Sequence, residues 1–317
     1  MAAVDPASAF GEDGFAILPG YLTPDDMGPA LRELAAVFPT ADQFHDNVEP
    51  ERNERFRDEF GGIVDFPFGS PELSLLAVHP RLVDLAEQLL GDEDLRVYSI
   101  EAWAKYTGAA DYDQSHHRDY LNHSLLVPAP EQPPAQVEMF LYLCEVPAGL
   151  GPPSYVPVRH TRGLPALPNW YPKVEGISDR EHPDWVSEQA SPQLYGVEVS
   201  ATGPPGTVAA YRIETFHRGT ALVAPRGARY TIHVNFRRAD ADWITRRGWT
   251  DTVSSDHWRE FVVRASARQL QLFGFPPPGH PYWSAETLDG MSRRYPGIDT
   301  APWAAGTSPR TVATRGG

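Results

Sequence analysis

Residues 115–120 read SHHRDY and place an imidazole and a carboxylate two positions apart, at His117 and Asp119. Side chains alternate between the two faces of a strand, so in a strand these two groups point the same way. His116 and Arg118 then point the other way. A neutral imidazole beside a carboxylate is a ligand pair for a divalent metal ion, but an ordinary surface salt-bridge cluster has the same composition. The rest of the chain has to decide between the two interpretations.

A second region with chemical potential surrounds His217, which follows a predicted strand ending near Phe216. The next predicted strand begins near Arg229, and an arginine that points inward needs a carboxylate or phosphate partner, because an unpaired buried charge is costly. The alternative is a surface arginine at a strand end, as Arg226 would be. Two imidazoles and one carboxylate form the facial triad of non-haem Fe(II) sites, which leaves three coordination positions open. The arginine would anchor a dicarboxylic co-substrate.

The composition excludes several classes of partner. The chain of 317 residues has 27 Lys and Arg against 42 Asp and Glu, a formal net charge of -15. Such a surface repels phosphate backbones and anionic membranes, so we expect neither nucleic acid nor a membrane as partner. The single cysteine, Cys144, allows no intrachain disulfide and no cysteine cluster for zinc. The N-terminal residues lack a signal-peptide pattern, and we expect a cytoplasmic protein.

Local signals predict two helices in the N-terminal region. Thr23 followed by Pro24 is a helix start, and apolar residues then recur at helical spacing up to Phe38. A second helix is predicted over 80–90, with Gly91 as its end. The polar, aperiodic stretch 45–63 predicts a loop, with a lid over the site as an alternative interpretation.

From Leu95 onward the sequence is rich in short β-type segments separated by Pro and Gly turns. Many short strands without intervening helices favour an antiparallel sandwich or jelly roll. After Arg238 the pattern predicts one long amphipathic helix from Trp258 to Phe273, and a loosely held tail after Tyr295. We therefore expect a single domain over 1–317, with a helical N-terminal segment (1–94), a β core (95–238) and a helical extension (239–317).

Four blocks of the sequence, in order, resemble the phytanoyl-CoA dioxygenase family of Fe(II)- and 2-oxoglutarate-dependent oxygenases. They are EDGFAILPGYLTPDDM, WAKYTG with SHHRDY, LYLCEVPAGLGPPSYVPVRHTRG, and PPGTVAAYRIETFHRGTALVAPRGARYTIHVNFR. The resemblance covers about residues 11 to 238. It implies a double-stranded β-helix (a jelly-roll, cupin-like core), framed by N- and C-terminal helices.

The resemblance also implies site residues. His117, Asp119 and His217 would bind Fe(II), and Arg229 would bind the distal carboxylate of 2-oxoglutarate. Two further residues complete the predicted co-substrate site, Lys105 and Phe140.

The sequence departs from the family in two places and agrees with its oxygenases in a third. The usual Pro-Gly-Ser-His reads Pro-Val-Arg-His at 157–160, which predicts a differently shaped turn. The arginine falls one position later than the commonest spacing, so Arg226 stays as a rival anchor. Asp119 is present where related halogenases have a small residue, and this disfavours halogenation.

The predicted function is hydroxylation of an unactivated C–H bond in a small-molecule substrate, with O2 and 2-oxoglutarate consumed and succinate and CO2 released. Desaturation, epoxidation and ring closure begin with the same oxidant. Tyr120, Asn122 and Arg212 are candidates to border the substrate, and we expect a monomer or homodimer. The competing interpretation is a non-redox metal-binding jelly roll, either a zinc-dependent hydrolase or isomerase or a small-molecule binding domain.

Overall fold

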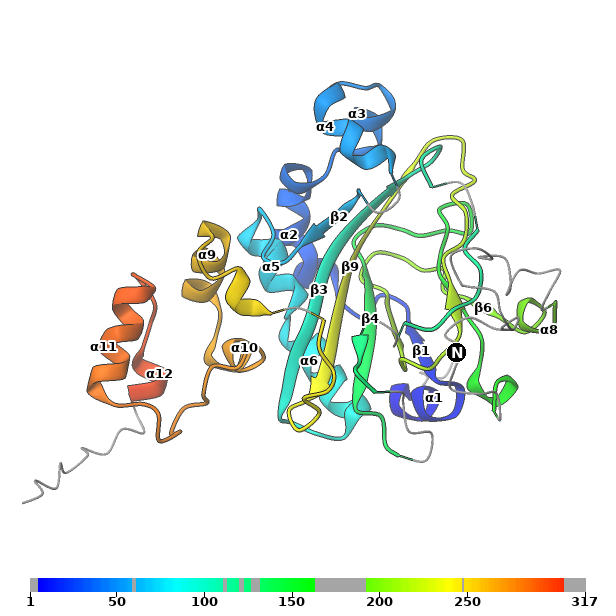
Figure 1. Ribbon diagram of the computed structural model, residues 1–317. Coiled ribbons are helices and arrows are strands. Elements are labelled where there is room, and N and C mark those ends of the chain that lie inside the picture. The colour runs from blue at the N-terminus through cyan, green and yellow to red at the C-terminus, as the bar shows by residue number, and fades with distance from the viewer. Residues whose placement is uncertain are drawn as a thin grey trace, which may run out of the picture. The chain divides into compact units, whose positions relative to one another are not determined.

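The computed structural model describes residues 5–58, 61–110, 113–119, 123–126, 132–162, 192–246 and 248–304 (Figure 1). The chain divides into two compact units, Met1–Arg247 and Gly248–Gly317. The first unit contains a mainly antiparallel β structure with flanking helices, and the second unit is helical. The single domain predicted over 1–317 is not tested by this division and stays a prediction.

A six-stranded antiparallel sheet dominates the first unit. Its strand order is β1 (Phe15–Leu18), β7 (Val208–Tyr211), β4 (Gln136–Tyr142), β9 (Ala228–Arg238), β3 (Leu95–Tyr106) and β2 (Ile63–Asp65). The long central pair β3 and β9 matches the segments predicted from sequence, and β3 has the predicted bounds. These two strands run side by side through the middle of the unit in Figure 1.

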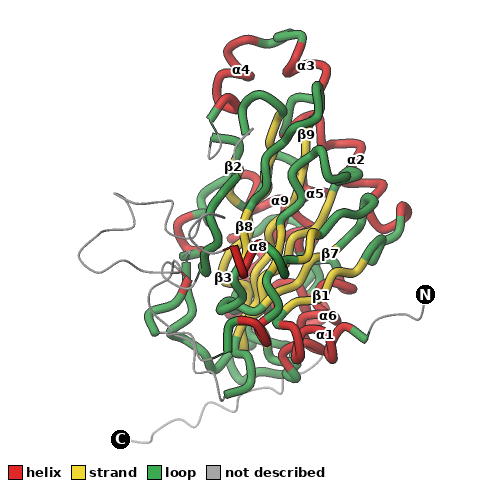
Figure 2. Tube along the Cα trace, turned by 90° about the vertical axis from the view of Figure 1, so that its right-hand side faces the viewer, coloured by secondary structure: helices red, strands yellow, loops and turns green. Residues whose placement is uncertain are grey.

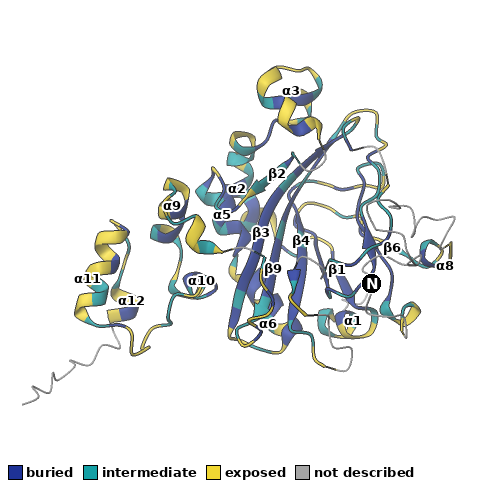
Figure 3. Ribbon diagram, in the orientation of Figure 1, coloured by how far each residue is buried: buried dark blue, intermediate teal, exposed yellow. Residues whose placement is uncertain are grey.

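The two faces of this sheet differ in chemistry, as the alternation of side chains requires. One face carries fully buried apolar side chains such as Ile232, Val234 and Met139, and helices α5 (Pro71–Ala77) and α6 (Pro80–Leu90) lie against its strands. The other face, here called the inner face, carries Lys105 and Arg229 in register. Other residues at these alternate positions include Glu101, Trp103, Gln136, Glu138, Phe140, Tyr142, Tyr211, Thr231, His233 and Asn235. Figure 3 shows that β3, β4 and β9 are largely buried.

A second, three-stranded antiparallel sheet lies beside the inner face. Its order is β6 (Val199–Ser200), β5 (Ser154–Tyr155) and β8 (His217–Arg218). The ring of Tyr155 packs against Phe15 of β1 and Tyr211 of β7, at centroid distances of 5.2 and 5.1 Å. The small sheet therefore presents at least one side chain to the inner face of the large sheet. Figure 2 shows β8 and α8 (Pro192–Tyr195) from another direction.

Both predicted N-terminal helices are present. Helix α2 (Pro24–Val37) begins after Thr23, whose hydroxyl and the Asp26 carboxylate form a reciprocal capping box. Helix α6 spans the predicted residues and ends at Gly91 in the left-handed conformation.

A further helix, α1 (Pro6–Asp13), was not predicted from the sequence. It ends at Gly14 with φ 83°. A Cβ at Gly14 would overlap Val158 Cγ1, so only glycine fits the close approach of the 157–160 turn.

The loop predicted over 45–63 is wrong for residues 50–57, which are helical. Helix α3 (Ala41–His45) ends inside the stretch, α4 (Pro50–Glu54) follows after a short turn, and the 3-10 turn η1 (Arg55–Arg57) continues α4. The amide of Asn53 is fully buried and donates to the carbonyls of Gln43 and Phe44, at 3.1 and 3.4 Å. Buried hydrogen bonds of this kind arise from contacts that an aperiodic, polar sequence does not reveal.

The helical unit corrects two further predictions. The single long helix is two helices, α9 (Asp256–Arg264) and α10 (Ala267–Gln271), because Ala265 is extended and Ser266 caps the second one. The tail predicted to be loosely held after Tyr295 is packed against the rest of its unit up to residue 304. Helix α11 (Ala285–Arg294) is followed by α12 (Ala301–Ala304), and Trp303 is 1% exposed with its indole donating to the Pro276 carbonyl at 3.1 Å.

Two short 3-10 turns, η2 (Val158–His160) and η4 (Trp249–Asp251), complete the described elements. Among the helices that the structure describes, none has the length and apolar character needed to cross a membrane.

Candidate metal centre

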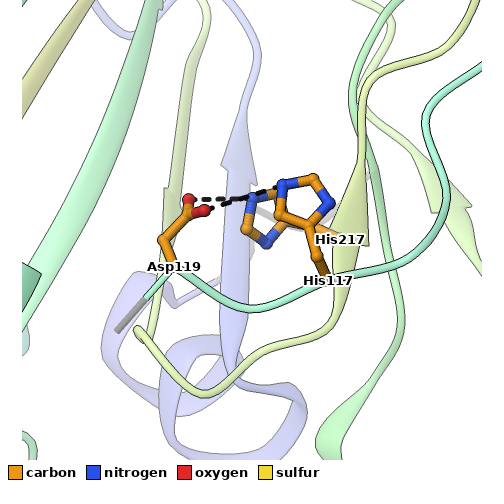
Figure 4. Close-up of side chains that lie close together, drawn as sticks. All are labelled: His117, Asp119 and His217. Carbon is orange, nitrogen blue, oxygen red and sulfur yellow. Dashed lines mark ion pairs between the residues drawn. The ribbon is translucent and has the colours of Figure 1, made fainter. Parts of the chain in front are cut away.

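His117, Asp119 and His217 meet beside the inner face. The two histidines face each other across an antiparallel bridge, with backbone N–H to carbonyl distances of 2.9 and 3.0 Å. Their Nε2 atoms lie 3.6 and 3.1 Å from the two carboxylate oxygens of Asp119, and one ligand atom from each residue falls within 4.8 Å of the others. Figure 4 shows both rings pointing at the carboxylate. His117 lies in a bridge and not in a regular strand, but the predicted shared direction of His117 and Asp119 holds.

Backbone carbonyls fix the tautomers of both histidines. Nδ1 of His117 lies 2.9 Å from the Ser115 carbonyl, and Nδ1 of His217 lies 3.1 Å from that of Thr215. A carbonyl only accepts, so each Nδ1 carries the hydrogen and each Nε2 is directed at the centre. Hydrogen bonds from the ring nitrogen that does not bind metal orient histidine ligands in this way. The donor set therefore fits a divalent metal ion.

Burial and the mutual charges of the three residues together set the protonation of the triad. Burial, followed by the neighbouring His217, lowers the pKa of His117 to about 4. Burial also opposes charge on His217 and Asp119, but the attraction between them outweighs it, raising the pKa of His217 and holding the pKa of Asp119 well below its usual value. Asp119 is thus an ionised ligand at neutral pH, and His117 is a neutral one, as metal coordination requires.

A chain of buried polar groups leads away from Asp119. The hydroxyl of Tyr211 lies 3.3 Å from Asp119 Oδ2 and 3.0 Å from Glu138 Oε2. Glu138 Oε1 accepts from the Tyr98 hydroxyl at 2.7 Å and pairs with His123 Nδ1 at 2.6 Å. We call Tyr98, His123, Glu138 and Tyr211 the Glu138 network. It holds the carboxylate side of the triad in a satisfied, rigid environment.

The inner face is positively charged at the end where Arg229 lies. Arg229 and Lys105 are cross-strand partners on β9 and β3, and each is only 6% exposed. Burial lowers the pKa of nearby His233 well below its usual value, and the charges of Arg229 and Lys105 lower it further. The ring of Phe140 lies 3.7 Å from the His233 ring, centroid to centroid. The structure therefore places the three predicted co-substrate residues, Arg229, Lys105 and Phe140, on one face.

The rival arginine is elsewhere. Arg226 is exposed and pairs with two surface carboxylates, Asp42 and Asp46, each at 2.9 Å. Its guanidinium is thus committed to the α3 region and not to the inner face.

Comparison with known proteins assigns the family. The phytanoyl-CoA dioxygenase family, PhyH, matches residues 10–229, which is more than half of the chain. The chain belongs to the phytanoyl-CoA dioxygenase family. This confirms the resemblance seen in the sequence and places the protein among the iron- and 2-oxoglutarate-dependent oxygenases.

Solved structures of similar fold share little sequence with this chain. EctD from S. alaskensis, crystallised with 2-oxoglutarate and 5-hydroxyectoine, is 19% identical, with a TM-score of 0.51 over 78% of this chain and 83% of that one. The epimerase SnoN from nogalamycin biosynthesis, in complex with Fe3+, alpha ketoglutarate and nogalamycin RO, is 18% identical, with a TM-score of 0.48 over 74% of this chain and 82% of that one. No curated protein matches the sequence.

The departure of this phytanoyl-CoA dioxygenase family member at 157–160 has a structural counterpart. These residues form the η2 turn, in which Arg159 makes an ion pair with Asp13 at the end of α1. Val158 fills the space above Gly14. The turn therefore joins the N-terminal helix to the small sheet.

Of the predicted substrate residues, only Arg212 can be placed. It forms an ion pair with Glu214 in the turn between β7 and β8. Tyr120 and Asn122 lie outside the described residues.

Behind the two histidine ligands lies a cluster that was not predicted from the sequence. Glu198 accepts from Arg218 at 2.9 and 2.8 Å and pairs with His116 Nε2 at 2.8 Å. His116 and Arg218 each adjoin a ligand histidine, and both point away from the triad. We call His116, Glu198 and Arg218 the Glu198 cluster. The sequence indicates part of this cluster, because the alternation of side chains places His116 on the side opposite His117. It does not identify Glu198 as the partner of His116, because Glu198 is distant along the chain.

We expect Glu198→Gln to loosen this support. The neutral amide removes a bidentate charge-assisted pair and weakens the hold on Arg218, so the free energy of unfolding should fall by about 2–3 kcal/mol. The cluster joins the two segments that carry the histidine ligands. The affinity of the folded protein for Mn(II), used as a divalent probe of the triad, should therefore fall as well. Urea denaturation and equilibrium metal binding measure the two effects.

The matched control is Asp242→Asn, which breaks an ion pair with Arg237 in which Asp242 is 88% exposed. Exposed pairs contribute little, so its stability should stay within about 0.5 kcal/mol of wild type. Equal stability of the Glu198 and Asp242 variants would show that the Glu198 cluster does not support the site.

Proposed function

We propose that His117, Asp119 and His217 bind Fe(II) and that the protein uses 2-oxoglutarate and O2 to oxidise a small molecule. The observation that supports this most is the convergence of three ligand atoms within 4.8 Å, with both imidazoles oriented by backbone carbonyls, in a member of the phytanoyl-CoA dioxygenase family. A triad of two histidines and one carboxylate leaves positions of an octahedral iron open for co-substrate and O2. When bound, the iron would activate O2, which is the oxidant, while 2-oxoglutarate would supply two of the four electrons that O2 accepts and leave as succinate and CO2.

The fold in this proposal is the double-stranded β-helix. The two antiparallel sheets, with His217 on one and Arg229 on the other, support it. The helices α5 and α6 against the apolar face of the large sheet leave the inner face for chemistry.

The residues of the chain divide the work of binding and positioning. Arg229 holds the distal carboxylate of 2-oxoglutarate, and Lys105 adds positive charge beside it. Phe140 supplies an apolar wall near the co-substrate. Because Arg229 and Lys105 are almost fully buried, their interaction with a dianion is poorly screened by water.

Hydroxylation of an unactivated C–H bond is the reaction we propose, with desaturation, epoxidation and ring closure as other outcomes of the same oxidation. Arg212, Tyr120 and Asn122 remain the proposed substrate-bordering residues. A cytoplasmic location and a monomeric or homodimeric state complete the proposal.

A zinc-dependent hydrolase or isomerase, or a binding domain, is the alternative from a different class. The two buried cations on the inner face favour the oxygenase, because a hydrolytic zinc site has no use for a dicarboxylate anchor. The test is an anaerobic titration of the purified protein with Fe(II) and 2-oxoglutarate. We expect the weak visible charge-transfer absorption of the iron chelate to appear and saturate. Zinc in the purified protein, with no such absorption after exchange, would support the alternative.

The substrate class is accessible through coupled turnover. We expect a true substrate to stimulate succinate formation from 2-oxoglutarate well above the uncoupled rate. Screening candidate small molecules for this stimulation identifies the substrate even while the product is unidentified.

A further inference from the structure

Tyr155 of β5 is a buried phenol next to the metal centre. It is the cross-strand neighbour of His217 in the small sheet, so the two side chains lie on the same side. The residue is 0% exposed. Within the described residues, its hydroxyl has no hydrogen-bond partner. Neither metal binding by the triad nor the anchoring role of Arg229 explains why a phenol stands at this position.

Aromatic neighbours hold the ring in one place. The Tyr155 ring lies 5.2 Å from Phe15 in a stacked arrangement, 5.1 Å from Tyr211 and 6.0 Å from His217, centroid to centroid. Rings packed at these distances leave a side chain little rotational freedom. The side chain therefore keeps one rotamer, and its hydroxyl has a fixed position.

The packing of the ring places this phenol between the two sheets, where the metal centre adjoins the inner face. Its neighbours are Tyr211 of the large sheet, whose hydroxyl lies 3.3 Å from Asp119, and His217 of the triad. Burial raises the pKa of Tyr155, and Arg229 and Asp119 are among the groups that act on this pKa, so the phenol stays neutral and able to donate. A co-substrate that chelates the metal and extends to Arg229 has to pass through this region.

Other buried tyrosines of this unit show how the protein normally treats a phenol. Tyr142 donates to the Ala201 carbonyl at 2.6 Å, Tyr106 to the Pro39 carbonyl at 2.6 Å, and Tyr98 to Glu138 at 2.7 Å. A buried hydroxyl without a partner costs free energy that a phenylalanine of the same shape would avoid. The hydroxyl of Tyr155 is accordingly suited to a partner that binds from outside the protein.

We propose that the Tyr155 hydroxyl donates a hydrogen bond to a carboxylate oxygen of 2-oxoglutarate, as a second anchor beside Arg229. The inference rests on the proposed function, because it names a residue of the same co-substrate site. The chemistry is that of a neutral donor meeting an ionised acceptor in a region shielded from water, where such a bond is strong.

The test is Tyr155→Phe, which keeps the ring and removes only the hydroxyl. Anaerobic titration of the Fe(II)-loaded protein, followed by the charge-transfer absorption, should give a dissociation constant for 2-oxoglutarate raised about tenfold or more. The affinity for Mn(II) alone should not change, because the hydroxyl is not a metal ligand. The melting temperature of the metal-free variant should equal or exceed that of wild type, since an unsatisfied buried group has gone.

Tyr106→Phe is the matched control, because it also removes a single buried phenol hydroxyl, but one with an internal partner. It should lower the melting temperature and leave the affinity for 2-oxoglutarate unchanged. Unchanged 2-oxoglutarate affinity in Tyr155→Phe, or a loss of stability like that of the control, would overturn the inference while leaving the proposed function intact. A wild-type protein that binds no 2-oxoglutarate overturns both.

Discussion

Replacing Asp119 by glycine is expected to reduce substrate oxidation by orders of magnitude while leaving the protein folded. The change removes the anionic ligand of the triad, whose negative charge helps to stabilise the metal in its oxidised states. It keeps His117 and His217, whose backbone bridge does not depend on the carboxylate. Weak Fe(II) binding should therefore remain, and 2-oxoglutarate binding should still require Arg229. Succinate formation, Fe(II) affinity and the melting temperature measure these consequences.

Two variants extend this prediction to the other ligands. His117→Ala and Asp119→Ala should each abolish iron-dependent turnover, because each removes a metal ligand and not a side chain of the apolar core. Asp240→Gly is the control, since Asp240 is exposed and pairs with Arg238 at the surface. Retained turnover in both ligand variants would show that the triad is misassigned. If the wild type and Asp119→Gly bind substrate equally well and neither of them consumes oxygen, the oxygenase function itself is contradicted.

The elements that sequence predicts well are those with strong local signals. Helix α6 has a proline at its start, a regular apolar face and Gly91 at its end, and the prediction matches its bounds. Strand β3 combines β-branched and aromatic residues without a turn signal, and it also has the predicted bounds. In both, the determinants lie within a dozen residues of one another, which is the range over which periodicity and capping act.

The failures occur where distant contacts decide or where two local signals compete. The stretch 45–63 is polar and aperiodic, yet α4 forms there because buried Asn53 binds the backbone of α3. The C-terminal helix breaks at Ala265 because Ser266 is better suited to a cap than to a helix interior, a local choice that apolar periodicity alone does not expose.

The candidate site divides in the same way. The ligand residues have a spacing and a family pattern, so His117, Asp119 and His217 are found from sequence, and the structure brings them together. The residues that support the site, Glu198 and Tyr155, have neither a characteristic spacing nor a family pattern. Glu198 and Tyr155 reach the site only through the pairing of β5 with β6 and β8, which no local pattern encodes.

Arg229→Ala should raise the requirement for 2-oxoglutarate sharply. The guanidinium is buried on the inner face, and the loss of a buried charge-assisted pair costs on the order of 2–5 kcal/mol, or about thirty-fold to several-thousand-fold in affinity. Saturating 2-oxoglutarate should restore some of the turnover, since the triad is untouched. The melting-temperature increase that 2-oxoglutarate gives the metal-loaded wild type should disappear in the variant.

Arg226→Ala is the matched variant for this prediction and should change the 2-oxoglutarate requirement little. Arg226 lies three positions earlier and also carries a guanidinium, but its partners are the surface carboxylates Asp42 and Asp46. Comparing the two variants separates the loss of a general positive charge from the loss of a specific anchor. Lys105→Ala should have an intermediate effect, because Lys105 lies beside Arg229 and contributes charge without a planar fork for bidentate binding. The swapped result, with Arg226→Ala impaired and Arg229→Ala normal, would place the anchor on the α3 side of the protein and require a different path for the co-substrate.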